Sequence, residues 1–387
     1  MSIIPIGIIP ERIKGDMNSP FKYGRIVTGD SFINRSDDIK RIQQNIGSGI
    51  NTMIISPRRW GKSSLMKQVA YLNKDKKTKF AFIDFFNIRT EEDFYEKYST
   101  EIIKCTIGKK EELLQAGKNF FQKISPSFSF GVDPTNDFSL SFSWREAQKS
   151  KEEIINLPEV IARKKGIRIV VCIDEFQGIS KLNDHISVEQ ELRSYWQHHE
   201  NTCYCLYGSR RHMMLEIFKT ESRAFYRFGD LFFLEKIPEQ HWIKFIQQSF
   251  NKSGKGISKN LVAEMILLTN NHPDYLQQLC HNVWNVTDNE STEETIETAM
   301  DLVVRSNALH YQDICEALSN TQLNLVLAIL EGETKLTASE TMQKYNLGTP
   351  RNVSKNKKVL EEKDIVEFHG ETISFNDPIF EYWLRSK

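Results

Sequence analysis

The chain has 387 residues, which is enough for two or three domains with cores of their own. Its 51 lysines and arginines balance its 51 aspartates and glutamates, so no overall charge attracts it to nucleic acid or membrane, and any such affinity must be local. It contains no run of 18 apolar residues and no secretory signal pattern, so we expect a cytoplasmic protein without a membrane partner.

The six cysteines are scattered, and most lie in apolar segments. This is typical of reduced core residues and not of a disulfide framework. Cys203 and Cys205 suggest a metal pair, but no second Cys or His pair at ligand spacing accompanies them. Alternation along a buried strand explains the pair better.

Residues 1–20 contain three prolines and little periodicity, so we expect an N-terminal arm. A helix then follows from the segment Phe32–Ile39 to about Ile46, and either Ser36 or Asp37 is suited to cap it.

Residues 52–64 combine a short apolar strand, a turn and the start of a helix. From Ser56 to Ser63 they match the P-loop pattern G-x-x-x-x-G-K-[ST] everywhere except at the first glycine, which is Ser56. In this pattern backbone N–H groups at a helix N-terminus cradle phosphates, Lys62 reaches the β- and γ-phosphates, and the Ser63 hydroxyl ligates Mg²⁺. The alternative is an ordinary glycine-containing turn between a strand and a helix.

The predicted nucleotide contacts extend along the whole loop and into the first helical turn. The helix expected before the P-loop strand would pack beside the nucleotide base. The loop and first-turn candidates are Arg58, Arg59, Trp60, Gly61, Lys62, Ser63 and Ser64.

Two features follow the P-loop helix. Residues 80–86 form a buried strand that ends at Asp84–Asn87, and Thr90 opens a helix with a capping signature. Over residues 125–144, apolar and small polar residues alternate around Asp133–Asn136, which predicts a β-hairpin. Its aromatic stripe is either a face packed on the body of the protein or an interaction surface.

A near-continuous apolar run, Ile167–Ile173, is typical of a strand buried on both faces of a parallel sheet, and it ends in Asp174 and Glu175. At that end of a strand Asp174 can hold Mg²⁺ and Glu175 can orient and deprotonate the attacking water. Many strands end in Asp, but the position of this pair about 110 residues after a P-loop strengthens the assignment.

Polar residues also follow the next strand. We expect a helix over 186–200 and then the strand Cys203–Tyr207, which leads into Ser209 and Arg210. Either side chain is a candidate to contact the γ-phosphate or the attacking water. Helix capping by Ser209 is equally compatible with the sequence.

A fifth strand at Leu231–Leu234 completes the pattern, so strands alternate with helices and predict a parallel α/β sheet with helices on both faces. A strand between the acidic strand and the P-loop strand marks the additional-strand branch of P-loop NTPases. We therefore expect a P-loop NTPase core over residues 21–236.

From Pro238 the periodicity is helical. Helices over 240–250, 258–268, 273–286 and 293–309 predict a helical lid at 237–310. Helices near 322–331, 338–345 and 350–362, followed by a short hairpin at 365–375 and a helix at 378–384, indicate a winged helix-turn-helix domain at 311–387.

The helix predicted at 350–362 has one apolar and one cationic face. Arg351, Lys355 and Lys358 fall within about 60° on a helical wheel, whereas Val353 and Leu360 lie opposite. Such a face suits phosphate contact by a recognition helix in the major groove of duplex DNA. The alternative is a solvated basic face on a domain that contacts proteins or extends the lid.

With these motifs in place, the chain resembles AAA+ ATPases, and specifically the archaeal-type ATPase family that is grouped with the STAND signalling ATPases and is similar to the origin-recognition ATPases. The resemblance covers about residues 21–290 and a C-terminal domain of the expected kind. It rests on Phe32–Ile39, Ser56–Ser64, Val170–Glu175, Gly208–Met214 and Asn271–Tyr275.

The resemblance implies phosphate and Mg²⁺ binding by Lys62 and Ser63, metal and water roles for Asp174 and Glu175, and a sensor role for Ser209 or Arg210. It also places His272 and Pro273 near the adenine. The preference for adenine rests on the resemblance.

Arg223 or Arg227 resembles an arginine finger that acts on a neighbouring subunit, although a structural role in the turn before the fifth strand is equally compatible. Two departures from the family pattern predict slow hydrolysis. The first P-loop glycine is Ser56, and the lid helix after Pro273 lacks an arginine in the place of the second sensor.

We expect an ATPase that hydrolyses Mg-ATP and couples its nucleotide state to movement of the lid and winged helix, with duplex DNA as a candidate partner. The alternative is a nucleotide-dependent switch with little turnover, or a signalling scaffold that binds a protein through the 125–144 hairpin. Self-association through the ATPase core is a further candidate interaction.

Overall fold

The computed structural model describes residues 18–106, 129–132, 138–141, 144–369 and 372–387. Most of the expected N-terminal arm and the turn expected at Asp133–Asn136 lie outside the described residues. The strands of the expected hairpin are present, because β3 (Ser129–Val132) pairs antiparallel with β4 (Phe138–Ser141). The two interpretations of its aromatic stripe stay predictions.

Five parallel strands form the central sheet in the order β2–β5–β6–β1–β7. Strand β6 lies between the acidic strand β5 and the P-loop strand β1, as expected. Because parallel strands align their carboxyl ends, the residues that follow β1, β5 and β6 meet at one edge of the sheet. The bounds are Thr52–Ile55 for β1, Thr78–Asp84 for β2, Arg168–Asp174 for β5, Thr202–Gly208 for β6 and Asp230–Phe233 for β7.

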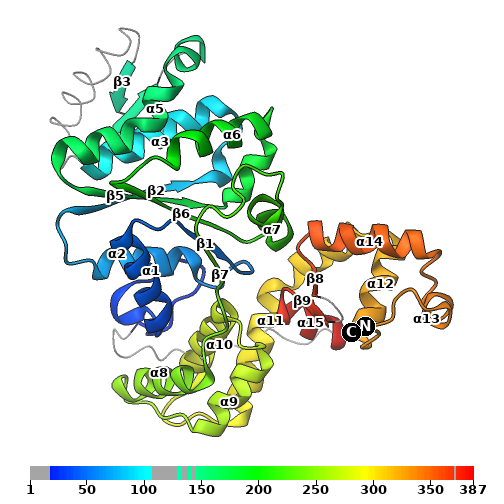
Figure 1. Ribbon diagram of the computed structural model, residues 1–387. Helices are drawn as coiled ribbons and strands as arrows, with labels where there is room; N and C mark the ends of the chain where they lie inside the picture. The colour runs from blue at the N-terminus through cyan, green and yellow to red at the C-terminus, as the bar shows by residue number, and fades with distance from the viewer. Residues whose placement is uncertain (1–17, 107–128, 133–137, 142–143, 370–371) are drawn as a thin grey trace.

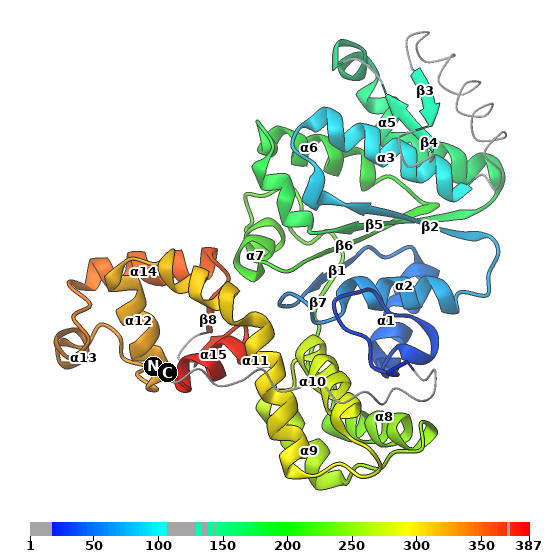
Figure 2. The ribbon, with the colours of Figure 1, turned by 180° about the vertical axis from the view of Figure 1, so that it is seen from behind.

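Helices cover both faces of this sheet, with α3, α5 and α6 on one side and α1 and α2 on the other (Figure 1; Figure 2). Strand residues alternate between the two layers. Met53 and Ile55 belong to the cluster under the first group of helices, whereas Ile54 packs with Ile42 of α1 and Leu65 of α2. The bounds are Ser36–Ser48 for α1, Lys62–Leu72 for α2, Glu91–Thr106 for α3, Trp144–Lys165 for α5, His185–Trp196 for α6 and Arg211–Lys219 for α7.

Two helix starts test the capping predictions. The side chains of Thr90 and Asp93 accept hydrogen bonds from each other's backbone N–H groups, which confirms the capping signature of α3. The cap predicted for α1 is wrong, because Arg35 occupies the N-cap position and makes no side-chain cap bond. The guanidinium of Arg35 is buried and donates instead to distant backbone carbonyls, so a tertiary contact fixes where this helix begins.

After β7 the chain is helical up to β8. The first four helices of this region are α8 (Glu239–Lys252), α9 (Lys259–Leu268), α10 (Pro273–Val286) and α11 (Glu293–Glu316). Helix α11 continues beyond the predicted end at 309, and the boundary expected between 310 and 311 falls inside it. Tyr311 explains the extension, since it is buried against Phe380 and Trp383.

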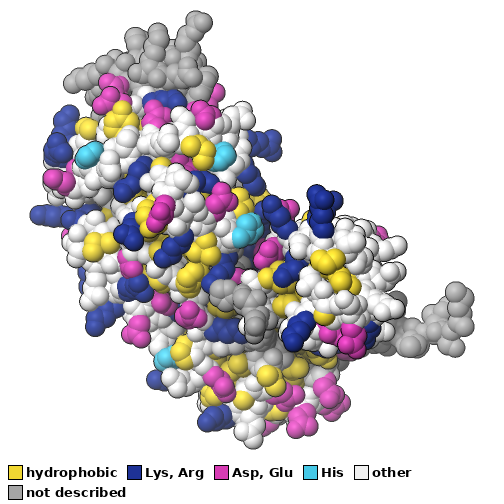
Figure 3. Space-filling model, turned by 45° about the vertical axis from the view of Figure 1, so that its right-hand side comes forward, with side chains coloured by type: hydrophobic (Ala, Val, Ile, Leu, Met, Phe, Trp, Pro, Cys, Tyr) yellow, Lys and Arg dark blue, Asp and Glu magenta, His cyan; other side chains and the backbone are white. Residues whose placement is uncertain are grey.

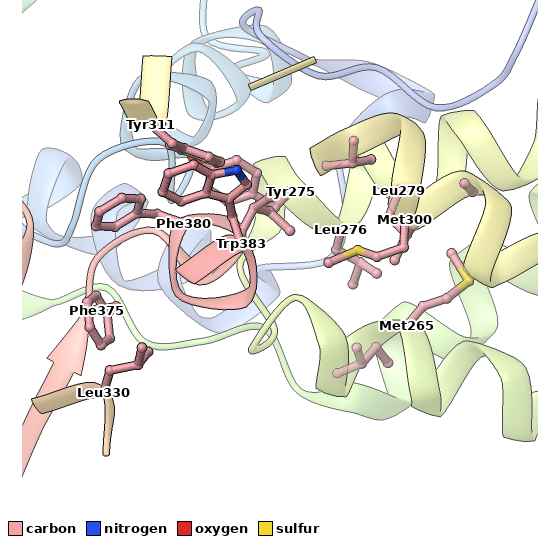
Figure 4. Close-up of a cluster of buried hydrophobic side chains, with 14 of the residues drawn as sticks. Met265, Tyr275, Leu276, Leu279, Met300, Tyr311, Leu330, Phe375, Phe380 and Trp383 are labelled. Carbon is pink, nitrogen blue, oxygen red and sulfur yellow. The ribbon is translucent and has the colours of Figure 1, made fainter. Parts of the chain in front are cut away.

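Three helices, an antiparallel hairpin and a terminal helix form the C-terminal unit. Its core is continuous with that of the four preceding helices, and Figure 4 shows Met300 and Leu276 in the same cluster as Phe380 and Trp383. The two regions therefore share apolar burial. The bounds are Asn320–Leu330 for α12, Ser339–Lys344 for α13, Pro350–Glu362 for α14, Val366–His369 for β8, Thr372–Phe375 for β9 and Pro378–Arg385 for α15.

The C-terminal unit also contacts the domain of the five-stranded sheet through ion pairs. Arg58 of the P-loop lies 3.0 Å from Asp364, and Arg211 lies 3.4 Å from Glu367. Positive and negative side chains are interspersed over the face of the molecule seen in Figure 3, in keeping with the balanced composition. Among the described residues, no helix is both long enough and apolar enough to cross a bilayer.

Candidate active site

The loop between β1 and α2 has the backbone of an anion-binding turn. Arg59 and Gly61 have φ of 58° and 92°, and Gly61 is the N-cap of α2. A Cβ on Gly61 would meet no atom within 4 Å, so the glycine serves the backbone conformation and not a lack of space. Ser56 does not adopt a positive φ, which explains why serine is tolerated at the first position of the pattern. The N–H groups of the first turn of α2 lack helical partners and can bind phosphate.

Lys62 is buried beneath this loop. Its Nζ donates to the carbonyl oxygens of Ser56 and Pro57 at 2.8 and 2.9 Å. Burial lowers the pKa of Lys62 to about 8, although the nearby Glu175 and Asp174 act in the opposite direction. A desolvated ammonium held against its own loop is suited to contact an incoming phosphate.

Oxygen atoms suited to Mg²⁺ come together beside the loop. The Ser63 hydroxyl donates to Oδ2 of Asp174, and Asp84 lies in register with Asp174 on the neighbouring strand β2. Burial raises the pKa of Asp174 to about 6. Hydroxyl and carboxylate oxygens are the ligands that Mg²⁺ takes beside nucleotide phosphates, so these residues fit the ion. Among the residues described, no group of three His, Cys, Asp or Glu side chains forms a self-contained metal site.

Glu175 lies one residue after Asp174, with a φ of 49°. Its Oε2 accepts a hydrogen bond from the Ser209 hydroxyl at 2.8 Å and another from the side-chain amide of Gln177. The structure thus joins the ends of β5 and β6 through side chains. Ser209 is not the cap of α7, because Arg210 occupies that N-cap position, so the capping alternative is wrong.

Lys62, Ser63, Asp174 and Glu175 line a cavity of about 450 Å³ at the carboxyl edge of the sheet. A smaller cavity of about 70 Å³ shares several lining residues with it and reaches Trp60, Pro273 and the apolar Val27 and Ile237. The first has the polar lining of a phosphate site, and the second has the mixed lining of a base site. The larger cavity is lined by Gly24, Arg25, Ile26, Arg58, Arg59, Gly61, Lys62, Ser63, Ser64, Asp84, Phe86, Asp174, Glu175 and Asp274.

Comparison with protein families agrees with this arrangement. The model of an ATPase domain predominantly from Archaea matches residues 32–279, which is more than half of the chain. The chain belongs to this archaeal-type ATPase family. A model of a probable winged helix domain matches residues 309–386.

Solved structures support the fold of this archaeal-type ATPase. The Walker-type ATPase PABY2304 of Pyrococcus abyssi is similar with a TM-score of 0.64 and 14% identity, over 95% of this chain and 99% of that chain. The ORC2 protein of Aeropyrum pernix, in its ADPNP–ADP complexes, gives a TM-score of 0.53 and 13% identity, over 96% and 98% of the two chains. No curated protein matches the sequence.

The other predicted P-loop contact residues of the chain bind neighbouring regions, among them the lid and the C-terminal unit. Arg58 pairs with Asp364 of the C-terminal unit, and Arg59 lies 3.7 Å from Asp274 of α10. The Ser64 hydroxyl accepts from the N–H of Val27 at 3.1 Å. The P-loop is therefore tied both to the lid and to the winged helix domain.

Arg210 lies apart from the phosphate cavity. It lines a cavity of about 170 Å³ at the contact between the sheet domain and the C-terminal unit, together with Asp364 and Glu361. Ser209 lines the same cavity, but its hydroxyl donates to Glu175, which lines the phosphate cavity. This hydrogen bond favours Ser209 of the two sensor candidates.

The two arginine-finger candidates differ in their surroundings. Arg223 has a side chain only 8% exposed, and it binds both carboxylate oxygens of Glu189 and one of Glu216. Arg227 is exposed and lies over the ring of Tyr226. The geometry therefore favours the structural alternative for Arg223 and leaves Arg227 as the finger candidate.

The cations of α14 lie on the surface of the winged helix domain. Arg351, Lys355 and Lys358 are exposed, and Val353 and Leu360 are buried, as the helical wheel predicts. Lys358 lies 3.9 Å from Glu362 on the same helix. The face is available for a partner, and its role stays a prediction.

Sequence reasoning missed three residues at this site. Arg35 donates to the carbonyl of Trp60 at 3.2 Å and holds the P-loop from α1. Asp274 accepts from the N–H of Gly24 at 2.8 Å and fixes the N-terminal segment over the cavity. Gln177 binds Glu175. Arg35 and Asp274 lie within segments that carry the family resemblance, whereas nothing in the sequence around Gln177 distinguishes it.

Proposed function

We propose that the protein hydrolyses Mg-ATP at the cavity between the P-loop, β5 and β6. The observation that carries the proposal is that Lys62, Ser63, Asp174 and Glu175 line one cavity, although the first and last of these residues lie in different parts of the sequence. Membership of an ATPase family agrees with this function.

Each residue has a chemical role in the proposed reaction. The N–H groups of the loop and Lys62 hold the phosphates, while Ser63 and Asp174 hold Mg²⁺. When bound, the ion neutralises charge on the β- and γ-phosphates. The water oxygen forms a bond to the γ-phosphorus, the water proton passes to Glu175, and the bond to the bridging oxygen breaks to give ADP and phosphate. Ser209 orients the γ-phosphate or the water.

We further propose that this site controls the lid and the winged helix domain. Arg59 faces Asp274 of the lid, and Arg58 faces Asp364 of the C-terminal unit. Phosphates that attract either arginine would change these contacts, so the nucleotide state and the domain arrangement are coupled. The exposed cations of α14 make duplex DNA a candidate for the moving domain.

A nucleotide-dependent switch with little turnover is the second candidate. The absence of an arginine in the lid at the second sensor position favours it. In that case the output is binding to DNA or to a protein, and ATP is the ligand that selects the binding state.

ATP binding and turnover, measured with and without duplex DNA at moderate salt, test these proposals. Lys62→Ala should abolish binding, whereas Glu175→Gln should bind ATP and lower turnover at least 100-fold, because only the proton acceptor is lost. Lys76→Ala, an exposed lysine beyond α2, is the matched control and should behave as the wild type.

The outcomes separate the candidates. Normal turnover in Lys62→Ala or Glu175→Gln would rule out the site. Tight ATP binding with negligible wild-type turnover would favour the switch. Stimulation by DNA that is lost in the Arg351/Lys355/Lys358 triple alanine variant would connect the winged helix to hydrolysis, and its absence would direct attention to protein partners.

A further inference from the structure

Gln177 is a buried amide whose contacts converge on Glu175. It lies in the 3₁₀ helix η3 (Phe176–Lys181), and only 4% of the residue is exposed. Its Nε2 donates to Oε2 of Glu175, which is the oxygen that also accepts from the Ser209 hydroxyl. One carboxylate oxygen therefore has two donors, while Oε1 of Glu175 has no recorded hydrogen bond within the described part of the chain.

The local backbone brings the amide back onto the carboxylate. Glu175 is in the left-handed region, with φ 49° and ψ 41°, and its carbonyl accepts from the N–H of Gly178 at 2.8 Å. A non-glycine residue in this conformation is unfavourable unless its surroundings fix it. The tight turn and the bond from Gln177 together fix the direction of the Glu175 side chain.

The amide orientation is set by its neighbours. Exchanging the nitrogen and oxygen of Gln177 would place its oxygen against the Glu175 carboxylate, which excludes the exchange. In the orientation observed, Oε1 of Gln177 is buried and has no hydrogen-bond partner among the described residues. An unpaired buried carbonyl is unfavourable. The hydrogen-bonding groups of the Gln177 amide are therefore not all satisfied in the core.

Gly208 provides the space that Gln177 occupies. A Cβ at this position would lie 1.9 Å from Oε1 of Gln177 and 2.7 Å from Sδ of Met214. The φ of Gly208 is not positive, so the lack of a side chain matters here for space and not for conformation. The position of the Gln177 amide thus depends on the absence of a side chain at Gly208.

We propose that Gln177 is a positioning residue that holds Glu175 during hydrolysis, when the hydroxyl proton of Ser209 turns toward the γ-phosphate. A serine hydroxyl has one proton and cannot donate it to Glu175 and to a phosphate at the same time. Gln177 keeps one donor on Oε2 in both arrangements, and Oε1 remains free to accept the proton of the attacking water. The inference rests on the proposed hydrolysis of ATP.

Two substitutions separate hydrogen bonding from packing. Gln177→Met keeps a similar volume without a donor, and we expect kcat to fall 10- to 100-fold while the dissociation constant of ATP stays within twofold. Gln177→Glu places a second carboxylate against Glu175 in place of the donor, and we expect a loss of kcat at least as large.

Gln247→Met is the matched control, because the amide of Gln247 binds the carbonyl of Ile257 in the lid.

A second variant gives an independent measurement. Gly208→Ala should reproduce the loss of kcat, and combining it with Gln177→Met should add little, because both changes remove the same hydrogen bond. Wild-type kcat in Gln177→Met, or a loss of kcat matched by an equal loss of ATP affinity, would overturn the inference while leaving hydrolysis intact. Failure of the wild type to show Glu175-dependent turnover would overturn both.

Discussion

At the residue scale, burial of the Asp174 carboxylate in the candidate site lowers the stability of the fold when the group is ionised. Burial is the largest cause of its raised pKa, the charge of Glu175 adds to it, and the bond from Ser63 and the charge of Lys62 oppose it. Desolvation therefore outweighs the favourable contacts, and the site holds a carboxylate that is costly to ionise without a cation.

The first prediction concerns the pH dependence of stability without Mg²⁺ or nucleotide. A carboxyl group whose pKa is raised from 3.8 to about 6 stabilises the fold below the lower value and loses that contribution as the pH rises through 6. Asp174→Asn stays neutral, so its free energy of unfolding relative to that of the wild type should increase by roughly 2–2.5 kcal/mol between pH 4 and 8. Urea unfolding at several pH values measures this difference.

Asp75→Asn is a control of opposite sign. The hydrogen bond from Thr78 lowers the pKa of Asp75, so this residue stabilises the fold at neutral pH and loses that effect as the pH falls. The difference in free energy of unfolding between Asp75→Asn and the wild type should decrease as the pH falls. A constant difference between Asp174→Asn and the wild type across the range would show that Asp174 is not desolvated.

At the scale of elements, an ion pair anchors the segment between α7 and β7. Arg223 binds Glu189 of α6, whose side chain is 1% exposed, and this contact joins the segment to that helix. Removing one member of a buried pair leaves the other charged and without a partner, which costs more than an exposed pair contributes. The size of the loss in the free energy of unfolding on substitution therefore distinguishes a structural arginine from an arginine finger.

The second structural prediction uses this contrast. Arg223→Ala should lower the free energy of unfolding by roughly 3–5 kcal/mol because Glu189 loses its partner. Arg227→Ala, which removes an exposed guanidinium, should stay within about 0.5 kcal/mol of the wild type. Urea unfolding midpoints test both variants. If Arg223→Ala is as stable as the wild type, the side chain is free to act elsewhere, and the finger assignment returns to Arg223.

At the scale of the whole molecule, the winged helix domain competes for a P-loop residue. The side chain of Asp364 is 25% exposed and that of its partner Arg58 is 53% exposed, so their ion pair is of moderate strength. Because Arg58 also lines the phosphate cavity, domain contact and phosphate binding depend on the same guanidinium. Any coupling through it must act in both directions.

Asp364→Asn should therefore raise ATP affinity about two- to fivefold, corresponding to roughly 0.5–1 kcal/mol for the lost pair. Asparagine tolerates the left-handed conformation of this residue, whose φ is 63°, so the backbone should persist. Equilibrium binding of a fluorescent ATP analogue provides the measurement.

Glu367→Gln is the matched comparison for this prediction. It weakens the other ion pair between the two units without releasing a P-loop arginine. An equal gain of affinity in Glu367→Gln would assign the coupling to domain contact in general. No gain in Asp364→Asn would exclude competition for Arg58.

The sequence by itself determined the order of strands and helices and the position of the P-loop. Apolar runs indicate strands that are buried on both faces of a sheet. The spacing of Gly61, Lys62 and Ser63 is also local, so both signals can be recognised within a short segment of sequence. The limits of α10 and α14 follow for the same reason, since proline at the first turn marks where each begins.

Only the tertiary structure decided which polar groups meet. Gln177 contacts Glu175 because the turn after β5 folds back beside Gly208, and Arg58 contacts Asp364 because a shared apolar core joins the C-terminal unit to the lid. Hydrogen bonds and ion pairs act over a few ångströms, and they require side chains to be placed together by packing that involves distant parts of the chain. Sequence patterns predict such groups one at a time, whereas the fold determines their partners.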